Sequence, residues 1–188
     1  MTDITKARIL IIATNGFEQS ELEVPRDKLR AAGAQVDVAS QDGKEIRGWD
    51  KKDWGRTVSV NLKIADAKES DYTALVIPGG VMNPDKLRID DDAMKIVRSF
   101  LASGKVVAAV CHGPWLLVQA DALRGRKATS YPSIRKDMEN AGAKWVDEEV
   151  VADNGIITSR KPDDLNAFTA KIIEEIREGR HERRQAAE

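Results

Sequence analysis

Apolar runs that end beside glycine or polar residues dominate the hydrophobic pattern of the chain. Residues 7–14, 74–77 and 106–110 are continuous enough to predict strands that are buried on both faces of a parallel sheet. After the first run, apolar positions at 22, 25, 29 and 32 have helical spacing, and an alternating stretch at 36–40 follows. This β-α-β order predicts a right-handed crossover and a doubly wound α/β fold.

The remaining pattern predicts further elements around this sheet. Glycines, two tryptophans and alternating polar and apolar residues indicate a projecting hairpin within 41–61, where Trp49 and Trp54 could cap a local core or form a subunit contact. We expect three more elements after the third buried strand: a strand at 128–131, a helix at 134–141 and a hairpin at 150–159. Helices are also expected over 91–103 and from 162 onwards.

The chain's one cysteine lies where the third buried strand ends. Cys111 is followed by His112, Gly113 and Pro114, a sequence that favours a tight turn and an immediate helix start. Unpaired amides at such a helix start favour a thiolate, so we expect a lowered pKa for Cys111 and a nucleophilic role. A buried structural cysteine is the alternative, but it would need no adjoining His-Gly-Pro.

Two other strand ends carry groups that could meet this cysteine. Glu18 follows the first strand, and Gly79 and Gly80 follow the second, where their flexible backbone could bring amides close to a ligand. The carboxyl ends of parallel strands share one edge, so a nucleophile, a proton carrier and oxyanion donors could share one crevice. For Glu18, an exposed acid at a helix start is the alternative.

Composition narrows the class of protein. The 188 residues predict a single domain over 1–179, with a charged tail at 180–188 that has little to bury. A net charge of -1 gives no electrostatic attraction to nucleic acid or to an anionic membrane. No apolar run reaches the length of a membrane span. One cysteine and two histidines predict neither a disulfide nor a metal site, and we expect a cytoplasmic protein without a cofactor.

Several motifs, taken together, make the chain resemble the PfpI family, over roughly residues 5–178. The family includes intracellular cysteine peptidases, and its superfamily includes a protein deglycase, glutathione-independent glyoxalases and stress proteins. The resemblance implies a flavodoxin-like three-layer α/β/α sandwich of the class I glutamine amidotransferase type, with a nucleophile elbow. The motifs are Phe17-Glu18, Ile77-Pro78-Gly79-Gly80, Ala109-Val110-Cys111-His112-Gly113-Pro114, Leu123-Arg124-Gly125-Arg126-Lys127 and Thr129-Ser130-Tyr131-Pro132.

Site roles follow from that resemblance. Cys111 would be the nucleophile, and Glu18 the protonated carboxyl that hydrogen-bonds its sulfur. His112 would act as a base or lend its amide, and Gly79 and Gly80 would form the oxyanion pocket.

The resemblance also implies a shared site in a homo-oligomer. Peptidase members place an acid after Pro-Gly-Gly that orients the histidine across a subunit boundary; Asp85 is nearest here, one residue later and one methylene shorter. We therefore expect a dimer or a hexamer. Gly113, Trp115 and Tyr131 complete the implied substrate pocket, and Trp115 stands where relatives often carry glutamine.

Three functions remain open from the sequence. A stress-response enzyme that acts on small dicarbonyls, or on glycated protein or peptide, needs only a thiol and a carboxyl, and it ranks first. A peptidase must also protonate an amine leaving group and hold an extended chain, so it ranks second. A redox sensor that uses an oxidisable thiol ranks third.

Overall fold

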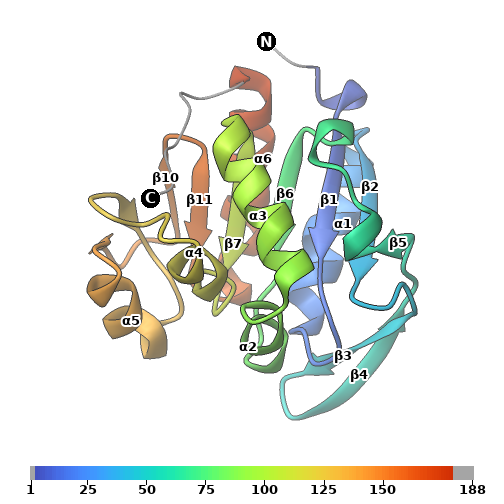
Figure 1. The fold of residues 1–188 in the computed structure, drawn as a ribbon, viewed down its shortest axis with the longest axis horizontal. Coiled ribbons are helices and arrows are strands. Elements are labelled where there is room, and N and C mark those ends of the chain that lie inside the picture. Colours follow the sequence, from blue (N-terminus) through green and yellow to red (C-terminus); the bar gives the residue numbers. More distant parts are fainter. Residues whose placement is uncertain (1–2, 180–188) are drawn as a thin grey trace.

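A seven-stranded sheet forms the centre of the computed structural model, which describes residues 3–179 (Figure 1). The strand order is β10-β11-β7-β6-β1-β2-β5, and every pairing is parallel except that of β10 with β11. The three continuous apolar runs of the sequence form the three central strands, as predicted. The strands are β1 (Arg8–Ile12), β2 (Gln35–Ser40), β5 (Leu62–Lys63), β6 (Ala74–Ile77), β7 (Val106–Val110), β10 (Val150–Asp153) and β11 (Ile156–Ser159).

Helices cover both faces of this sheet. On β1, Ile9 and Ile11 belong to the core under α1 (Gln19–Ala31) and α6 (Leu165–Glu178). The alternate residues Leu10 and Ile12 belong to the core under α3 (Asp91–Ser103). The fold is thus the expected three-layer α/β/α sandwich with a mainly parallel sheet. The shorter helices are α2 (Met82–Leu87), α4 (Trp115–Gln119) and α5 (Arg135–Asn140).

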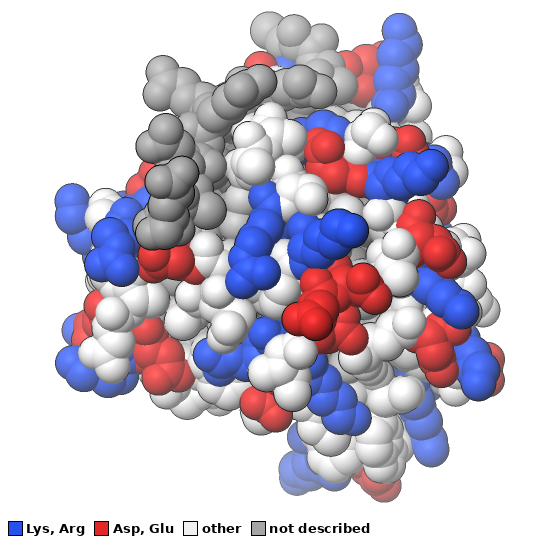
Figure 2. All heavy atoms as spheres, viewed as in Figure 1, with Lys and Arg blue, Asp and Glu red and all other residues white. Residues whose placement is uncertain are grey.

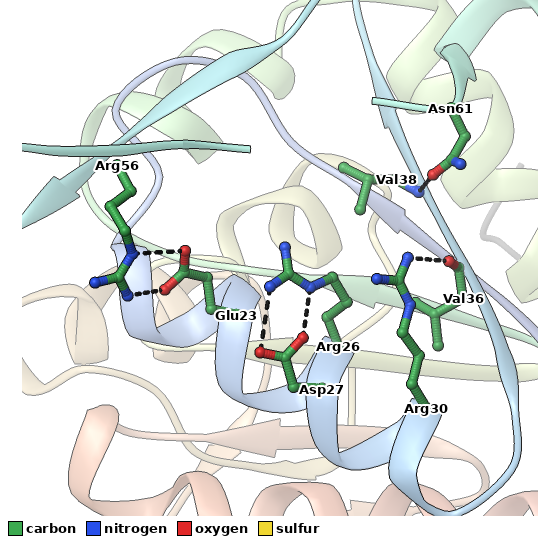
Figure 3. Close-up of polar contacts among 8 residues, drawn as sticks. All are labelled: Glu23, Arg26, Asp27, Arg30, Val36, Val38, Arg56 and Asn61. Atoms are coloured by element: carbon green, nitrogen blue, oxygen red, sulfur yellow. Dashed lines mark hydrogen bonds and ion pairs between the residues drawn. The ribbon is translucent and has the colours of Figure 1, made fainter. Parts of the chain in front are cut away.

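The predicted hairpin is present and is bound to the turn between β1 and α1. It consists of the antiparallel strands β3 (Ile46–Asp50) and β4 (Asp53–Val58). The Trp49 amide donates to the Phe17 carbonyl at 2.7 Å, so the hairpin lies beside the start of α1. An ion pair between Arg56 and Glu23 joins β4 to the outer side of α1 (Figure 3). These contacts hold the hairpin against the start of α1, beside the carboxyl end of β1.

Two segments differ from the expectation. A helix that the sequence analysis did not predict, α2, follows Gly79-Gly80, and the strand expected at 128–131 is only β8 (Lys127–Ala128), paired in parallel with β9 (Lys144–Trp145). Beyond β8 the chain approaches the elbow, where the Tyr131 amide donates to the Cys111 carbonyl oxygen at 2.9 Å. Residues 131–133 are thereby drawn toward the elbow.

Positive and negative side chains are interspersed on the face seen in Figure 2, in keeping with the small net charge. No helix within residues 3–179 is both long and apolar enough to cross a membrane. The tail expected at 180–188 lies outside the described residues.

Candidate active site

Cys111 occupies a sharp turn between β7 and α4. Its φ of 63° lies in the left-handed region, which costs a non-glycine residue roughly 1 kcal/mol or more. The Cys111 amide donates to the Ser159 carbonyl at 3.0 Å, and the Gly113 amide donates to the Val110 carbonyl at 2.8 Å. A Cβ atom at Gly113 would lie only 2.6 Å from the Ile77 carbonyl oxygen. The predicted elbow is present, and the packing around it holds the strained cysteine in place.

His112 is packed against the thiol and is buried. Its Nδ1 lies 3.2 Å from Cys111 Sγ, and its Nε2 lies 3.0 Å from Ser133 Oγ. The ring stacks on Tyr131, with ring centres 5.0 Å apart, and the Trp115 ring meets it edge-on at 5.2 Å. Burial lowers the pKa of His112, so the imidazole is neutral near pH 7 and can accept a proton.

Glu21, in the first turn of α1, carries the carboxyl group that contacts the Cys111 thiol. Glu21 is fully buried, and its Oε2 accepts a hydrogen bond from the Gly79 amide at 2.9 Å. Its carboxyl is close enough to Cys111 for the thiol to affect its pKa, whereas Glu21 Oε1 has no hydrogen-bond partner among residues 3–179. Burial raises the pKa of Glu21 to about 8, against a smaller lowering by the Cys111 thiol and the Gly79 amide. Near neutral pH the carboxyl therefore keeps its proton.

Glu18 does not have the place that the sequence predicted for it. We expected its carboxyl to hydrogen-bond the sulfur, but the carboxyl beside the sulfur is that of Glu21, one helical turn further on. Glu18 is only half-buried. Burial, and then the charge of Asp50, raise the pKa of Glu18. The backbone amide of Lys51 and the side chain of Ser20 partly oppose this rise of its pKa. It lines the outer part of the site.

A sequence signal for Glu21 existed. Pro25 lies four residues later on the same helix, on the apolar stripe that faces the core, so Glu21 continues that stripe with a carboxyl group. A carboxyl on a buried stripe is a stronger candidate for a raised pKa than one at a helix start. Ser133 had no comparable signal, because its approach to His112 depends on where the chain turns after Tyr131.

The two glycines allow the carboxyl and the thiol to meet. A Cβ atom at Gly79 would lie 2.5 Å from Glu21 Oε2 and 2.7 Å from Cys111 Cβ. Gly80 has a φ of 75°, and its amide is close enough to the Cys111 sulfur and to the Glu21 carboxyl to lower the pKa of each. The His112 amide also lowers the pKa of the thiol. Two amides thus converge where negative charge would develop on an adduct of Cys111.

The expected lowering of the Cys111 pKa is wrong for this arrangement. Burial raises the pKa of the thiol most, and the negative charge of an ionised Glu21 raises it further. The amides of Gly80 and His112 act in the opposite direction with less effect. Cys111 is only 6% exposed, and burial disfavours the charged thiolate. The expectation of a lowered pKa considered only the favourable effect of the helix start.

A crevice of about 420 Å³ opens over these groups. Its lining includes Glu18, Glu21, Cys111 and His112, together with Trp49 of the hairpin. The site thus unites the ends of β1, β6 and β7, as expected for strand ends at one edge of a sheet. Among residues 3–179 no cluster of side chains is suited to hold a metal ion.

Of three further predicted site residues, Tyr131 lines the crevice, whereas Trp115 and Asp85 lie outside its lining. Tyr131 is half exposed and stacks on His112, whereas Trp115 is tied outward by a hydrogen bond from its Nε1 to Asp137 Oδ2 at 2.9 Å. Asp85 is exposed on α2. Within one chain, the Nε2 of His112 is held by Ser133 and not by Asp85.

Comparison with known proteins gives a consistent result. The sequence profile of the DJ-1/PfpI family matches residues 7–175. General stress protein 18 of Bacillus subtilis is 45% identical over 168 residues, which cover 88% of this chain and 95% of that protein. Deglycase PfpI of Pyrococcus furiosus is 40% identical over 166 residues, which cover 88% and 97%.

Solved structures agree with this comparison. DJ-1beta of Drosophila melanogaster matches 92% of this chain and 94% of its own, with a TM-score of 0.81 and 29% identity. Other curated relatives at 41% identity are named as deglycases or as a candidate cysteine protease.

Proposed function

The chain belongs to the DJ-1/PfpI family, and from this premise we propose that it converts reactive dicarbonyls, or the adducts that they form with proteins, by covalent catalysis at Cys111. One observation supports this most: the fully buried, protonated carboxyl of Glu21 contacts the thiol at the base of a small crevice. A thiol and an acid with a pKa near the working pH are the two groups that dicarbonyl conversion requires.

The first half of the reaction forms a covalent adduct. The neutral His112 takes the thiol proton as Cys111 Sγ attacks the aldehyde carbon, and the C=O π bond breaks. The protonated Glu21 gives its proton to the resulting oxygen, while the amides of Gly80 and His112 stabilise the developing charge. The product is a hemithioacetal, with Glu21 now ionised and His112 positively charged.

The second half moves a proton between neighbouring carbons. Glu21 takes the proton from the carbon that carries sulfur, His112 protonates the second carbonyl oxygen, and an enediol forms. Glu21 then returns its proton to the second carbon, and His112 recovers one from the hydroxyl, which leaves a thioester. Water then hydrolyses the thioester: its oxygen bonds to the acyl carbon, the C–S bond breaks, and Glu21 takes one of its protons. His112 returns a proton to the Cys111 sulfur, and the hydroxy acid leaves. Dicarbonyl and water thus give a hydroxy acid.

Peptide cleavage is the second candidate function. The 3.2 Å contact between Cys111 Sγ and His112 Nδ1 favours it, since a cysteine peptidase also needs a thiol beside an imidazole. The crevice of about 420 Å³ and the exposed position of Asp85 favour a small substrate instead. We therefore keep the dicarbonyl or its protein adduct as the first substrate class.

The proposal includes a homo-oligomer, a dimer or a hexamer, in the cytoplasm. Val81 is 57% exposed and Ile89 is 82% exposed on either side of α2, which supports a contact with a second chain near Asp85. The lone free cysteine suits a reducing compartment. Light scattering at micromolar concentration tests the assembly, and a monomer would contradict it.

The function is tested by a comparison of substrates. Wild type and Cys111→Ala are assayed with methylglyoxal, a glycated peptide and a fluorogenic peptide. We expect turnover of the first or second substrate by the wild type and none above background by the variant. Turnover of the fluorogenic peptide alone would establish the peptidase, and equal rates for both proteins would refute catalysis by Cys111.

A further inference from the structure

The two ring nitrogens of His112 have different partners in the same chain. Nδ1 faces Cys111 Sγ at 3.2 Å, and Nε2 faces Ser133 Oγ at 3.0 Å. Ser133 lies on the short 3-10 helix Pro132–Ile134, whose entry is fixed by the bond from the Tyr131 amide to the Cys111 carbonyl. The same elbow that carries the thiol thus also places the hydroxyl.

The chemistry of a neutral imidazole gives this contact a consequence. A neutral ring carries one N–H, so Nδ1 can accept the thiol proton only when the hydrogen is on Nε2. That Nε2–H then needs an acceptor, and the Ser133 hydroxyl supplies a lone pair at hydrogen-bond distance. After the transfer, the imidazolium still donates from Nε2 to the same oxygen. One hydroxyl therefore serves the histidine before and after it takes the proton.

We propose that Ser133 is the positioning residue of His112: it holds the ring with Nδ1 toward Cys111 and favours the tautomer that can accept the thiol proton. Tyr131 stacks on the His112 ring and Trp115 meets it edge-on, so both restrict the plane of the ring. The hydrogen-bonding partners of its two nitrogens are Cys111 and Ser133. For the dicarbonyl reaction, the thiol, its base and the group that orients the base come from one chain. This inference rests on the proposed function only for the measurement of methylglyoxal turnover.

The test uses Ser133→Ala and the conservative Ser133→Thr, with Ser99→Ala as the control. Ser99 bonds its own helix through the Lys95 carbonyl and lies on α3, outside the crevice lining. The chain has two histidines, so the imidazole nitrogen resonances of His112 can be assigned by comparison with His112→Ala. Nitrogen NMR reports the tautomer, and the rate of thiol alkylation by iodoacetamide at pH 7 reports proton removal. Both readouts are independent of any substrate.

We expect Ser133→Ala to shift His112 toward a mixture of tautomers and to slow alkylation by about tenfold, as for the loss of one hydrogen bond. Turnover of methylglyoxal should fall by a similar factor in kcat with little change in KM. Ser133→Thr should restore each value to within about threefold. An unchanged tautomer and alkylation rate in Ser133→Ala would overturn the positioning role, as would failure of threonine to restore them. If no dicarbonyl is turned over while the first two readouts move, the proposed function fails and the positioning role stands.

Discussion

The buried Glu21 should make the stability of the fold depend on pH, and Glu21→Gln should remove this dependence. Glutamine has nearly the shape of a protonated carboxyl and keeps an oxygen that can accept from the Gly79 amide. The substitution therefore removes the ionisation while leaving the packing of α1 nearly intact.

The size and sign of the effect follow from the raised pKa. Glu21 ionises near 4.5 in an unfolded chain and near 8 in the folded site. Between these values the folded chain holds one proton more, so its stability is full below about pH 4.5 and is lost as the pH rises through 8. One proton corresponds to about 1.4 kcal/mol per pH unit, or roughly 4 kcal/mol from pH 4.5 to 7.5.

Urea denaturation at several pH values between 5 and 7.5 measures this slope. The free energy of unfolding of Glu21→Gln, relative to that of the wild type, should rise by about 1.4 kcal/mol for each pH unit. Glu18→Gln is the matched control: its half-buried carboxyl should give a clearly shallower slope. In the same preparations, Glu21→Gln should lose most turnover of methylglyoxal. A constant stability difference across this range would show that Glu21 is ionised throughout and would refute the proton-carrier argument.

Three other substitutions or profiles test the site. Alkylation of Cys111 by iodoacetamide should follow a pH midpoint above the ~8.5 of a free thiol, because burial raises its pKa; a lower midpoint would mean that the amides prevail. Asp85→Ala should abolish any peptide cleavage and leave dicarbonyl turnover within about tenfold, or about 1.4 kcal/mol of barrier, measured in parallel assays; equal losses would show one common mechanism. Gly79→Ala should destabilise the fold by about 1–3 kcal/mol in urea denaturation and slow turnover, because its methyl group would meet Glu21 and Cys111; a wild-type midpoint would contradict this crowding.

The sheet and the elbow could be predicted because their signals are local. The apolar run before Cys111 and the His-Gly-Pro after it together indicate a strand, a turn and a helix start. The same holds for Asn154-Gly155, which joins β10 to β11 as the sequence indicated.

The end of β1 in the sequence does not by itself show whether Glu18 or Glu21 contacts the Cys111 sulfur. Which carboxyl meets the sulfur depends on the rotation of α1 over the sheet, and that rotation is set by which face of the helix is apolar. The pKa of Cys111 was misjudged for a related reason: a helix start is visible in sequence, whereas the depth of burial depends on the whole fold. The approach of Ser133 to His112 is long-range and depends on how the segment after β8 is drawn to the elbow.

The pairing of β1 with β6 has a consequence for how the protein is made. Glu21 follows β1 and Cys111 follows β7, so the pair forms only after three strands that are distant in sequence have docked. Such long-range parallel pairing is slow to form compared with local contacts. During synthesis, a chain that has not yet docked β1 against β6 carries an ordinary, solvent-accessible thiol. Its pKa would be that of a free thiol, about 8.5, and it rises only when the completed fold buries Cys111 beside Glu21, so the chemical character of the thiol depends on the docking of the whole sheet.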